Sequence, residues 1–188
     1  MQPHRVTLIL AALFASAPAA PATCSAASPA HTVALVELYT SEGCSSCPPA
    51  DRWLSSLEGS GFRRDQVVPL ALHVDYWNHL GWPDPFSQAQ FSARQRQVAE
   101  WNRLGFVYTP QVTLQGRDFA AWRSSARFAD AVQAINRRPA GAGLELKLRS
   151  YPGRLALTLR AAVANPGAHG HAQAFVALYQ NRLSTEVP

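Results

Sequence analysis

The side chains best suited to chemistry in this sequence are two cysteines three positions apart, Cys44 and Cys47. They follow an apolar run over residues 33–40 and precede a helical pattern over residues 50–57. Two cysteines with this spacing can close a disulfide where a loop turns sharply into a helix. A sulfur at the start of a helix lies near unpaired N–H groups and the positive end of the helix dipole, which favour the thiolate. The arrangement predicts dithiol–disulfide exchange.

The two thiols are expected to have different roles because they differ in position relative to the helix. Cys44 is predicted to be the exposed attacking thiol, and Cys47, one helical turn further in, the resolving thiol. Such placements can lower a thiol pKa from about 8.5 to between about 3.5 and 7.5. A purely structural disulfide is the alternative. However, a short ring constrains little chain, and the entropic stabilisation by a disulfide grows with loop length.

One carboxylate interrupts the apolar run before the cysteines. Glu37 lies seven positions before Cys44, and a carboxylate in a buried strand is costly unless it is paired or protonated. Burial would raise its pKa. We expect Glu37 to lie beneath the dithiol and to relay the proton of Cys47 during resolution. The alternative is that its side chain reaches the end of the sheet and is solvated.

Two further segments are candidates for the substrate-binding side of the site. Pro110, preceded by Thr109, opens an apolar strand, a position where proline is tolerated. The Thr109–Pro110 bond is a candidate for the cis form. The segment 76–86 is rich in aromatic and turn residues, and is expected to pack over the sheet beside the dithiol, either as a substrate-contacting lid or as a local core. Its candidate contacts are Tyr76, Trp77 and Trp82.

The elements that must position these residues alternate between strand and helix over the first two thirds of the chain. Strands are predicted over 33–39, 67–74, 110–114 and 117–121, and helices over 50–57, from the cap at Ser87 to Leu104, and from a cap at Ser124 or Ser125. Residues 144–148 and 155–159 alternate between apolar and polar side chains, which predicts a β-hairpin with one solvated face. A third strand is expected over 174–179. The fold class is therefore α/β, a mixed sheet flanked by helices, followed by a small antiparallel β-rich section.

The N-terminus has the features of a secretory signal. Arg5 precedes an apolar stretch over residues 6–15, and small residues dominate positions 17–27. The stretch is too short to span a membrane as a helix. A signal peptide over 1–27 therefore predicts a periplasmic or secreted protein in a compartment where disulfides persist. Cys24 lies in the processing region. Cys24 is either removed with the signal peptide or lipidated, but the preceding Pro21-Ala22-Thr23 matches a lipidation site poorly.

Composition and charge limit the kinds of binding partner that we expect. The chain of 188 residues is 47% hydrophobic and carries a net charge of +5, with Lys147 the single lysine. The arginines are scattered over several elements, and no nucleic-acid motif is present. We therefore expect no nucleic-acid partner and no membrane span. The expected partners are a protein or small-molecule disulfide or dithiol, and an unidentified recycling partner.

The order of elements around the two motifs resembles the thioredoxin fold, although Ser45-Ser46 replaces the Gly-Pro of thioredoxin and the segment between Asp75 and Pro110 is longer. The resemblance implies that Thr109 and Pro110 face the dithiol and offer backbone hydrogen bonds to an extended substrate. A closer resemblance is to the exported domain of unknown function 1223 family, over residues 32–186. Its signature is similar to residues 37–51, 74–77, 80–86 and 108–111. Members usually continue further, so the β-rich section is expected to be incomplete.

These features divide the chain into a signal peptide at 1–27, a thioredoxin-like domain at 31–138 and the β-rich section at 143–188. The leading hypothesis is an exported thiol–disulfide oxidoreductase that needs no cofactor. The alternatives are a copper-binding or metallochaperone module and a non-catalytic adaptor that docks a partner through segment 76–86. Copper binding would need His73 or His79 to reach the cysteines, because thiolates suit Cu(I) and imidazole suits Cu(II). The cysteine spacing is one residue tighter than in thioredoxin-like copper carriers, which argues against it.

Overall fold

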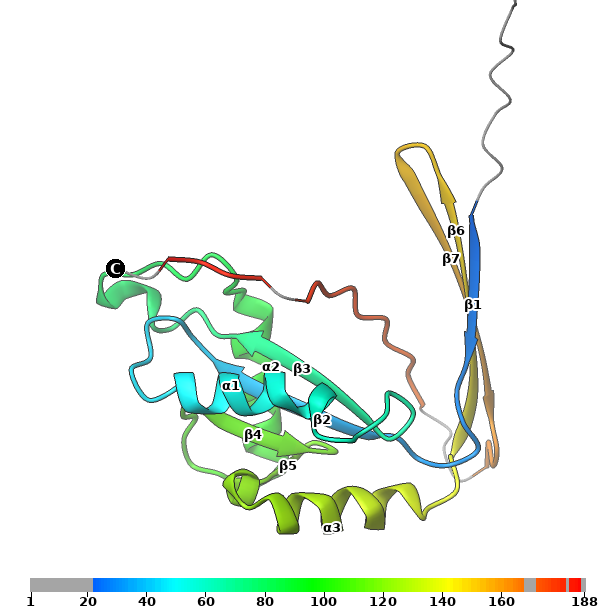
Figure 1. Ribbon diagram of the computed structural model, residues 1–188, viewed down its shortest axis with the longest axis horizontal. Coiled ribbons are helices and arrows are strands. Elements are labelled where there is room, and N and C mark those ends of the chain that lie inside the picture. The colour runs from blue at the N-terminus through cyan, green and yellow to red at the C-terminus, as the bar shows by residue number, and fades with distance from the viewer. Residues whose placement is uncertain (1–21, 168–171, 182, 187–188) are drawn as a thin grey trace, which may run out of the picture.

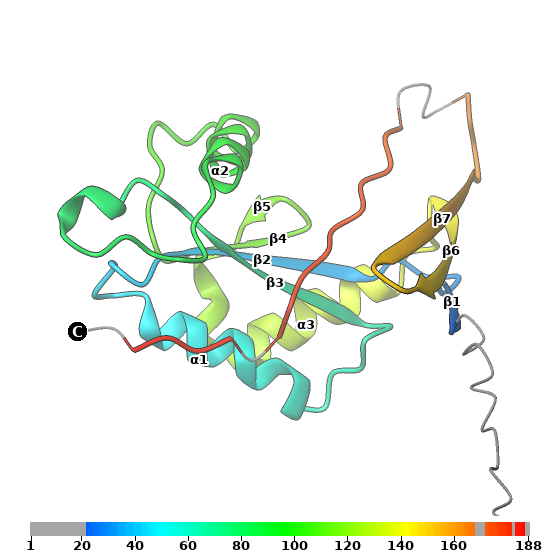
Figure 2. The ribbon, with the colours of Figure 1, turned by 90° about the horizontal axis from the view of Figure 1, so that it is seen from above.

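The computed structural model describes residues 22–167, 172–181 and 183–186. The larger part of the structure, called the α/β part below, is built on a four-stranded mixed sheet of order β3-β2-β4-β5. The central strand β2 (Ala34–Thr40) runs parallel to β3 (Val67–His73) and antiparallel to β4 (Gln111–Leu114), which pairs with the short β5 (Arg117–Asp118). Helices α1 (Pro48–Ser56) and α3 (Ser125–Asn136) cover one face, and α2 (Ala89–Trp101) covers the other (Figures 1 and 2). This arrangement confirms the predicted thioredoxin-like α/β class.

Strand β2 is buried on both faces, and its side chains alternate between two cores. Val36 and Leu38 belong to a cluster that includes Leu54 of α1 and Phe128 of α3. Tyr39 points to the other face and packs in a cluster with Val98 of α2. Odd-numbered residues of β2 therefore face α2, and even-numbered residues face α1 and α3. This assignment decides which side chains can reach the dithiol.

Local sequence signals explain the starts of α1 and α3 and the turn after β4. Cys47 is the N-terminal cap of α1, and Pro48 occupies its first position, where a missing N–H is harmless. Ser124 caps α3 by accepting a hydrogen bond from Arg127 N, as predicted. Gln115 and Gly116 adopt positive φ angles of 52° and 70° in the turn between β4 and β5. Short 3-10 turns follow α1 and precede α2 and α3, as η1 (Leu57–Gly59), η2 (Asn78–Leu80) and η3 (Ala120–Arg123).

The predicted bounds of one helix and one strand are too long. Helix α2 begins after Gln88 rather than at a cap on Ser87, and it ends at Trp101 rather than Leu104. Strand β5 ends at Asp118 rather than at residue 121, because the chain turns into η3. Neither difference changes the topology.

A second, antiparallel sheet of order β1-β6-β7 projects from one end of the α/β part (Figure 1). Strands β6 (Ala142–Tyr151) and β7 (Arg154–Val163) form the predicted hairpin. On the apolar face of this hairpin, Leu144, Leu155 and Leu157 are exposed among the described residues.

The third strand of this sheet differs from the prediction. Residues 174–179 lie within the described part of the chain but form no strand. The third strand is instead β1 (Thr23–Ala27), which pairs with β6 in the register Thr23–Arg149 to Ala27–Glu145. Residues 23–27 were expected to belong to the signal peptide and linker. The structure places these residues in a strand that pairs with β6.

The two segments that join the sheets run side by side. Thr32 N donates to Arg138 O and Ala140 N donates to Ala30 O, both at 2.9 Å, and Ser28 N donates to Leu144 O at 2.9 Å. The second sheet is therefore built from the segments that precede and follow the α/β part in the chain.

Among the described residues, none of the helices combines the length and apolarity that crossing a bilayer requires.

Candidate functional site

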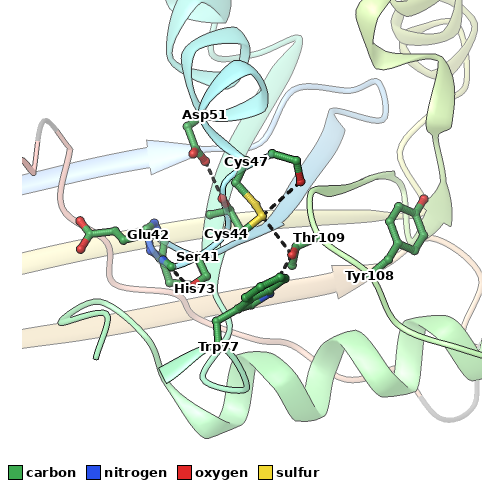
Figure 3. The surroundings of a disulfide bond; sticks show 12 residues. Ser41, Glu42, Cys44, Cys47, Asp51, His73, Trp77, Tyr108 and Thr109 are labelled. Carbon is green, nitrogen blue, oxygen red and sulfur yellow. Dashed lines mark hydrogen bonds between the residues drawn. A yellow bond between two sulfur atoms is a disulfide. The ribbon is translucent and has the colours of Figure 1, made fainter. Parts of the chain in front are cut away.

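Cys44 and Cys47 are joined by a disulfide at the start of α1 (Figure 3), with an S–S distance of 2.06 Å and a Cα–Cα distance of 5.4 Å. Backbone bonds hold the loop that carries it: Cys44 N donates to Ser41 O, and Cys47 N donates to Cys44 O, each at 3.1 Å. The first turn of α1 begins directly at Cys47, whose carbonyl accepts from Ala50 N at 2.8 Å. The predicted junction of strand, dithiol loop and helix is confirmed.

Both cysteines are buried, Cys44 to 1% and Cys47 to 0% residual exposure. The prediction of an exposed Cys44 is therefore wrong for the disulfide form. The segment before Pro110 lies against Cys44, with Thr109 Oγ1 3.3 Å from its sulfur. Ser45 and Ser46 are exposed, so the loop meets solvent through its serines rather than through its sulfurs.

Thr109 and Trp77 form a chain of hydrogen bonds that ends on Cys44 (Figure 3). Trp77 Nε1 donates to Thr109 Oγ1 at 2.9 Å, and Thr109 Oγ1 donates to Cys44 Sγ at 3.3 Å. The Thr109–Pro110 peptide bond is cis, as the sequence suggested. The structure thus brings three of the expected site residues together, and it gives Thr109 a side-chain contact that the sequence argument did not foresee.

A buried polar network fixes the segment that presents Thr109. Gln95 of α2 donates to Tyr108 O at 2.7 Å and to Gln111 Oε1 at 2.9 Å. Asp118 Oδ1 accepts from Gln111 Nε2 at 2.8 Å and from Tyr108 Oη at 2.7 Å. Burial and the Asp118 carboxylate raise the pKa of Tyr108, so its hydroxyl keeps its proton and donates. The backbone on both sides of Thr109 is held by side chains of two elements.

Glu37 lies on the face of the sheet opposite to α1. Its carboxylate is buried and bonded to Arg94 of α2 at 2.5 Å, and it accepts from Thr113 Oγ1 at 3.3 Å. The hydrogen bond to Glu37 raises the pKa of Arg94. The structure therefore does not bring Glu37 beneath the dithiol as expected, and it does not solvate it either. Glu37 is the buried partner of an ion pair that joins β2 to the partly exposed Arg94 of α2.

A different carboxylate lies on the dithiol side. Asp51 follows Cys47 by one helical turn, and its Oδ1 accepts from Thr40 Oγ1 at 2.8 Å (Figure 3). Burial raises the pKa of Asp51, opposed by the Thr40 hydrogen bond and by His73. The sequence argument missed this residue, although its i+4 spacing from Cys47 was a usable signal.

His73 belongs to a second polar contact that ties the dithiol loop to the aromatic segment. His73 Nδ1 pairs with Asp84 Oδ2 at 2.7 Å, and the same oxygen accepts from Glu42 N at 2.8 Å. Asp84 is buried. Trp82 Nε1 donates to Glu42 Oε2 at 2.9 Å. Segment 76–86 therefore packs beside the dithiol loop, as predicted.

Tyr76 is less central than expected. Its hydroxyl donates to Gln95 Oε1 at 3.1 Å, on the α2 side of the sheet, and burial raises its pKa. Tyr76 therefore helps to build the support beneath Thr109 rather than facing the disulfide.

The copper hypothesis needs a histidine near the sulfurs. His73 uses Nδ1 to pair with Asp84, and His79 is exposed in η2. Within the described part of the chain, no three His, Cys, Asp or Glu side chains gather in a way that could hold a metal ion.

The fold and the site together define the class of protein: a thioredoxin-like α/β protein with a CxxC disulfide at the start of its first helix. The chain belongs to the family described as "Protein of unknown function (DUF1223)", whose pattern matches residues 35–188. It is also similar to the crystal structure of protein AGR_C_4864 from Agrobacterium tumefaciens. That similarity has a TM-score of 0.50 and 28% identity, over 69% of this chain and 72% of that chain. The search of the curated proteins found no match.

Proposed function

We propose that this protein is an exported thiol–disulfide oxidoreductase of the periplasm or extracellular space, in which Cys44 exchanges with the substrate and Cys47 resolves the intermediate. The observation that carries the proposal is the unequal environment of the two sulfurs. Thr109 Oγ1 donates to Cys44 Sγ, whereas Cys47 Sγ receives no side-chain hydrogen bond from the described residues. A donor favours the thiolate at Cys44, which is the nucleophile and leaving group in exchange.

The step balances in both directions. When the protein oxidises a substrate dithiol, one substrate thiolate attacks Cys44 Sγ, the Cys44–Cys47 bond breaks, and Cys47 leaves as a thiolate that takes up a proton. The second substrate thiolate then attacks the mixed disulfide and releases the Cys44 thiolate. The substrate loses two electrons, and the protein gains them. Reduction of a substrate disulfide is the same sequence reversed. The substrate and the recycling partner set the direction.

Access to Cys44 requires a local rearrangement, because its sulfur is buried in the disulfide form. The segment bearing Thr109 contacts the sulfur directly. A substrate that binds along this segment would replace the contacts that now cover Cys44. This is consistent with Thr109 and Pro110 acting as a substrate-binding edge.

Single-cysteine variants test the proposal. In a Cys24→Ser background, Cys47→Ser should accumulate a mixed disulfide with glutathione, and Cys44→Ser should not, as read by intact mass after incubation with oxidised glutathione. Cys44→Ser should also abolish exchange. Wild-type exchange in Cys44→Ser, or equal adduct formation by both variants, would contradict the assigned roles.

A further inference from the structure

The chemistry of the side chains determines which groups donate and which accept in the hydrogen-bond chain at Cys44. An indole N–H donates and cannot accept, so the oxygen of Thr109 must be the acceptor of the 2.9 Å bond from Trp77 Nε1. The single hydroxyl proton of Thr109 is then free to point at Cys44 Sγ, 3.3 Å away. Trp77 therefore orients a donor toward the sulfur that the proposed function makes reactive.

Trp77 is held in this position by the dithiol loop itself. A Cβ added at Gly43 would lie 3.4 Å from the Cβ of Trp77 and 3.7 Å from Ser41 Oγ. The backbone next to Cys44 thus packs directly against Trp77. On the other side, Thr109 is fixed by the bond from Gln95 to the preceding carbonyl of Tyr108. The two residues that supply these hydrogen bonds, Trp77 and Thr109, are therefore held in place by different parts of the fold.

We propose that Trp77 is a positioning residue that acts through Thr109 to stabilise the Cys44 thiolate and so sets the reduction potential of the Cys44–Cys47 pair. The inference rests on the proposed function. A thiolate is a stronger hydrogen-bond acceptor than a disulfide sulfur, because hydrogen bonds to charged groups are roughly twice as strong as neutral ones. The donor chain therefore favours the reduced form, lowers the thiolate pKa and makes the disulfide a stronger oxidant.

The effect can be separated from the fixed charges around the disulfide. Among the described residues, Glu42, Asp51, His73 and Asp84 are the ionisable side chains of the dithiol loop, α1, β3 and segment 76–86 that bond at or beside the dithiol, and Tyr76 and Tyr108 belong to the support beneath Thr109. None is altered in the variants below. A pKa difference between variants therefore reports the removed donor.

The test uses Thr109→Val, which removes the hydroxyl at nearly constant shape, and Trp77→Phe, which removes only the indole N–H and part of the ring. Thr109→Val should raise the Cys44 pKa by about one unit, a tenfold loss of thiolate stabilisation. The potential should fall by about 30 mV, which is the same factor of ten. Trp77→Phe should shift the pKa and the potential in the same directions by smaller amounts. Thr109→Ser keeps the hydroxyl and should leave both near their wild-type values.

The measurements are thiolate absorbance against pH and equilibration in glutathione buffers, in a Cys24→Ser background. Trp82→Phe is the matched control, because it removes an indole N–H that bonds Glu42 rather than Thr109. The double variant Trp77→Phe/Thr109→Val should shift no further than Thr109→Val alone. Additive shifts, an unchanged pKa and potential in Trp77→Phe, or an equal shift in Trp82→Phe would overturn the inference. In each of these cases the exchange roles of Cys44 and Cys47 would stand.

Discussion

Removing the partner of Glu37 should destabilise the fold without slowing the chemistry. Arg94→Met keeps much of the length of the side chain but leaves the Glu37 carboxylate, 2% exposed, with the Thr113 hydroxyl as its remaining bond among the described residues. A buried charge without its counter-ion is strongly unfavourable. Glu37→Gln is the contrasting variant, because its neutral amide can still accept from Thr113, and the released Arg94 can turn to solvent.

The expected size follows from the exposure of the two partners. Breaking a fully buried ion pair costs about 3–5 kcal/mol, but Arg94 is 41% exposed and its charge is partly screened, so we expect about 2–3 kcal/mol for Arg94→Met. For a chain of this length, that corresponds to a fall in Tm of about 4–12 °C. Glu37→Gln should cost about 1 kcal/mol, the value of one ordinary hydrogen bond. In the double variant the penalty of Arg94→Met should largely disappear.

Urea unfolding at neutral pH measures these differences, and glutathione exchange well below Tm measures the chemistry. Exchange rates should stay within about twofold of wild type, since neither residue contacts the disulfide. The reasoning would be refuted if Glu37→Gln slowed resolution at unchanged stability, because Glu37 would then act as the proton relay after all.

Three further predictions concern other parts of the fold. The folded protein raises the pKa of Asp51, so ionising this carboxyl group costs folding stability as the pH rises past its ordinary pKa near 3.9. Asp51→Asn should therefore be more stable than wild type at pH 7, and this advantage should fade below about pH 3. A constant difference in urea unfolding across this range would contradict it. Phe128→Ala should lose about 3–5 kcal/mol of unfolding free energy, because Phe128 is 2% exposed and packs edge-on against Trp53 and Phe62; a loss below about 1 kcal/mol would mean that the core re-collapses. A chain beginning at Ser28 should lose hydrogen-exchange protection in β6 compared with one beginning at Ala22, while α1 and α3 keep theirs; equal protection of β6 would show that β1 is dispensable.

The dithiol loop and the segment with Thr109 and Pro110 could be predicted because the sequence features that indicate them are local. The cysteine spacing, the proline after Cys47 and the strand before it specify a loop-to-helix junction whatever the rest of the chain does. Thr109 and Pro110 stood out for the same reason, since a proline at the start of an apolar strand has few compatible structures. The burial of Cys44 could not be predicted, because it depends on how closely the Thr109 segment approaches.

The position of the Glu37 side chain was mispredicted because β2 is apolar on both faces. In a half-exposed strand, the alternation of polar and apolar residues indicates which side chains share a face with the helix that follows. The run from Ala34 to Thr40 carries no such signal. Helical spacing, in contrast, is regular, and it would have placed Asp51 below Cys47 without any knowledge of the sheet.

Strand β1 was missed because its composition suits two roles. Residues 23–27 are small, as expected near the end of a signal peptide, and small residues carry little strand preference. Their pairing partner lies in β6, far along the chain. Only the three-dimensional structure relates the two segments.

The pairing of β1 with β6 makes the α/β part an insertion within the second sheet. Joining β1 to β6 in an otherwise unfolded chain would mean closing a loop from residue 28 to residue 141, at a cost of about 4 kcal/mol by the logarithmic dependence on loop length. Once the α/β part has folded, its two ends already lie together, bonded at Thr32 and Arg138, and most of this cost is removed. The β1–β6 pairing should therefore form after the α/β part and depend on it, so that a weakened α/β core also releases β1, whereas the β6–β7 hairpin closes locally.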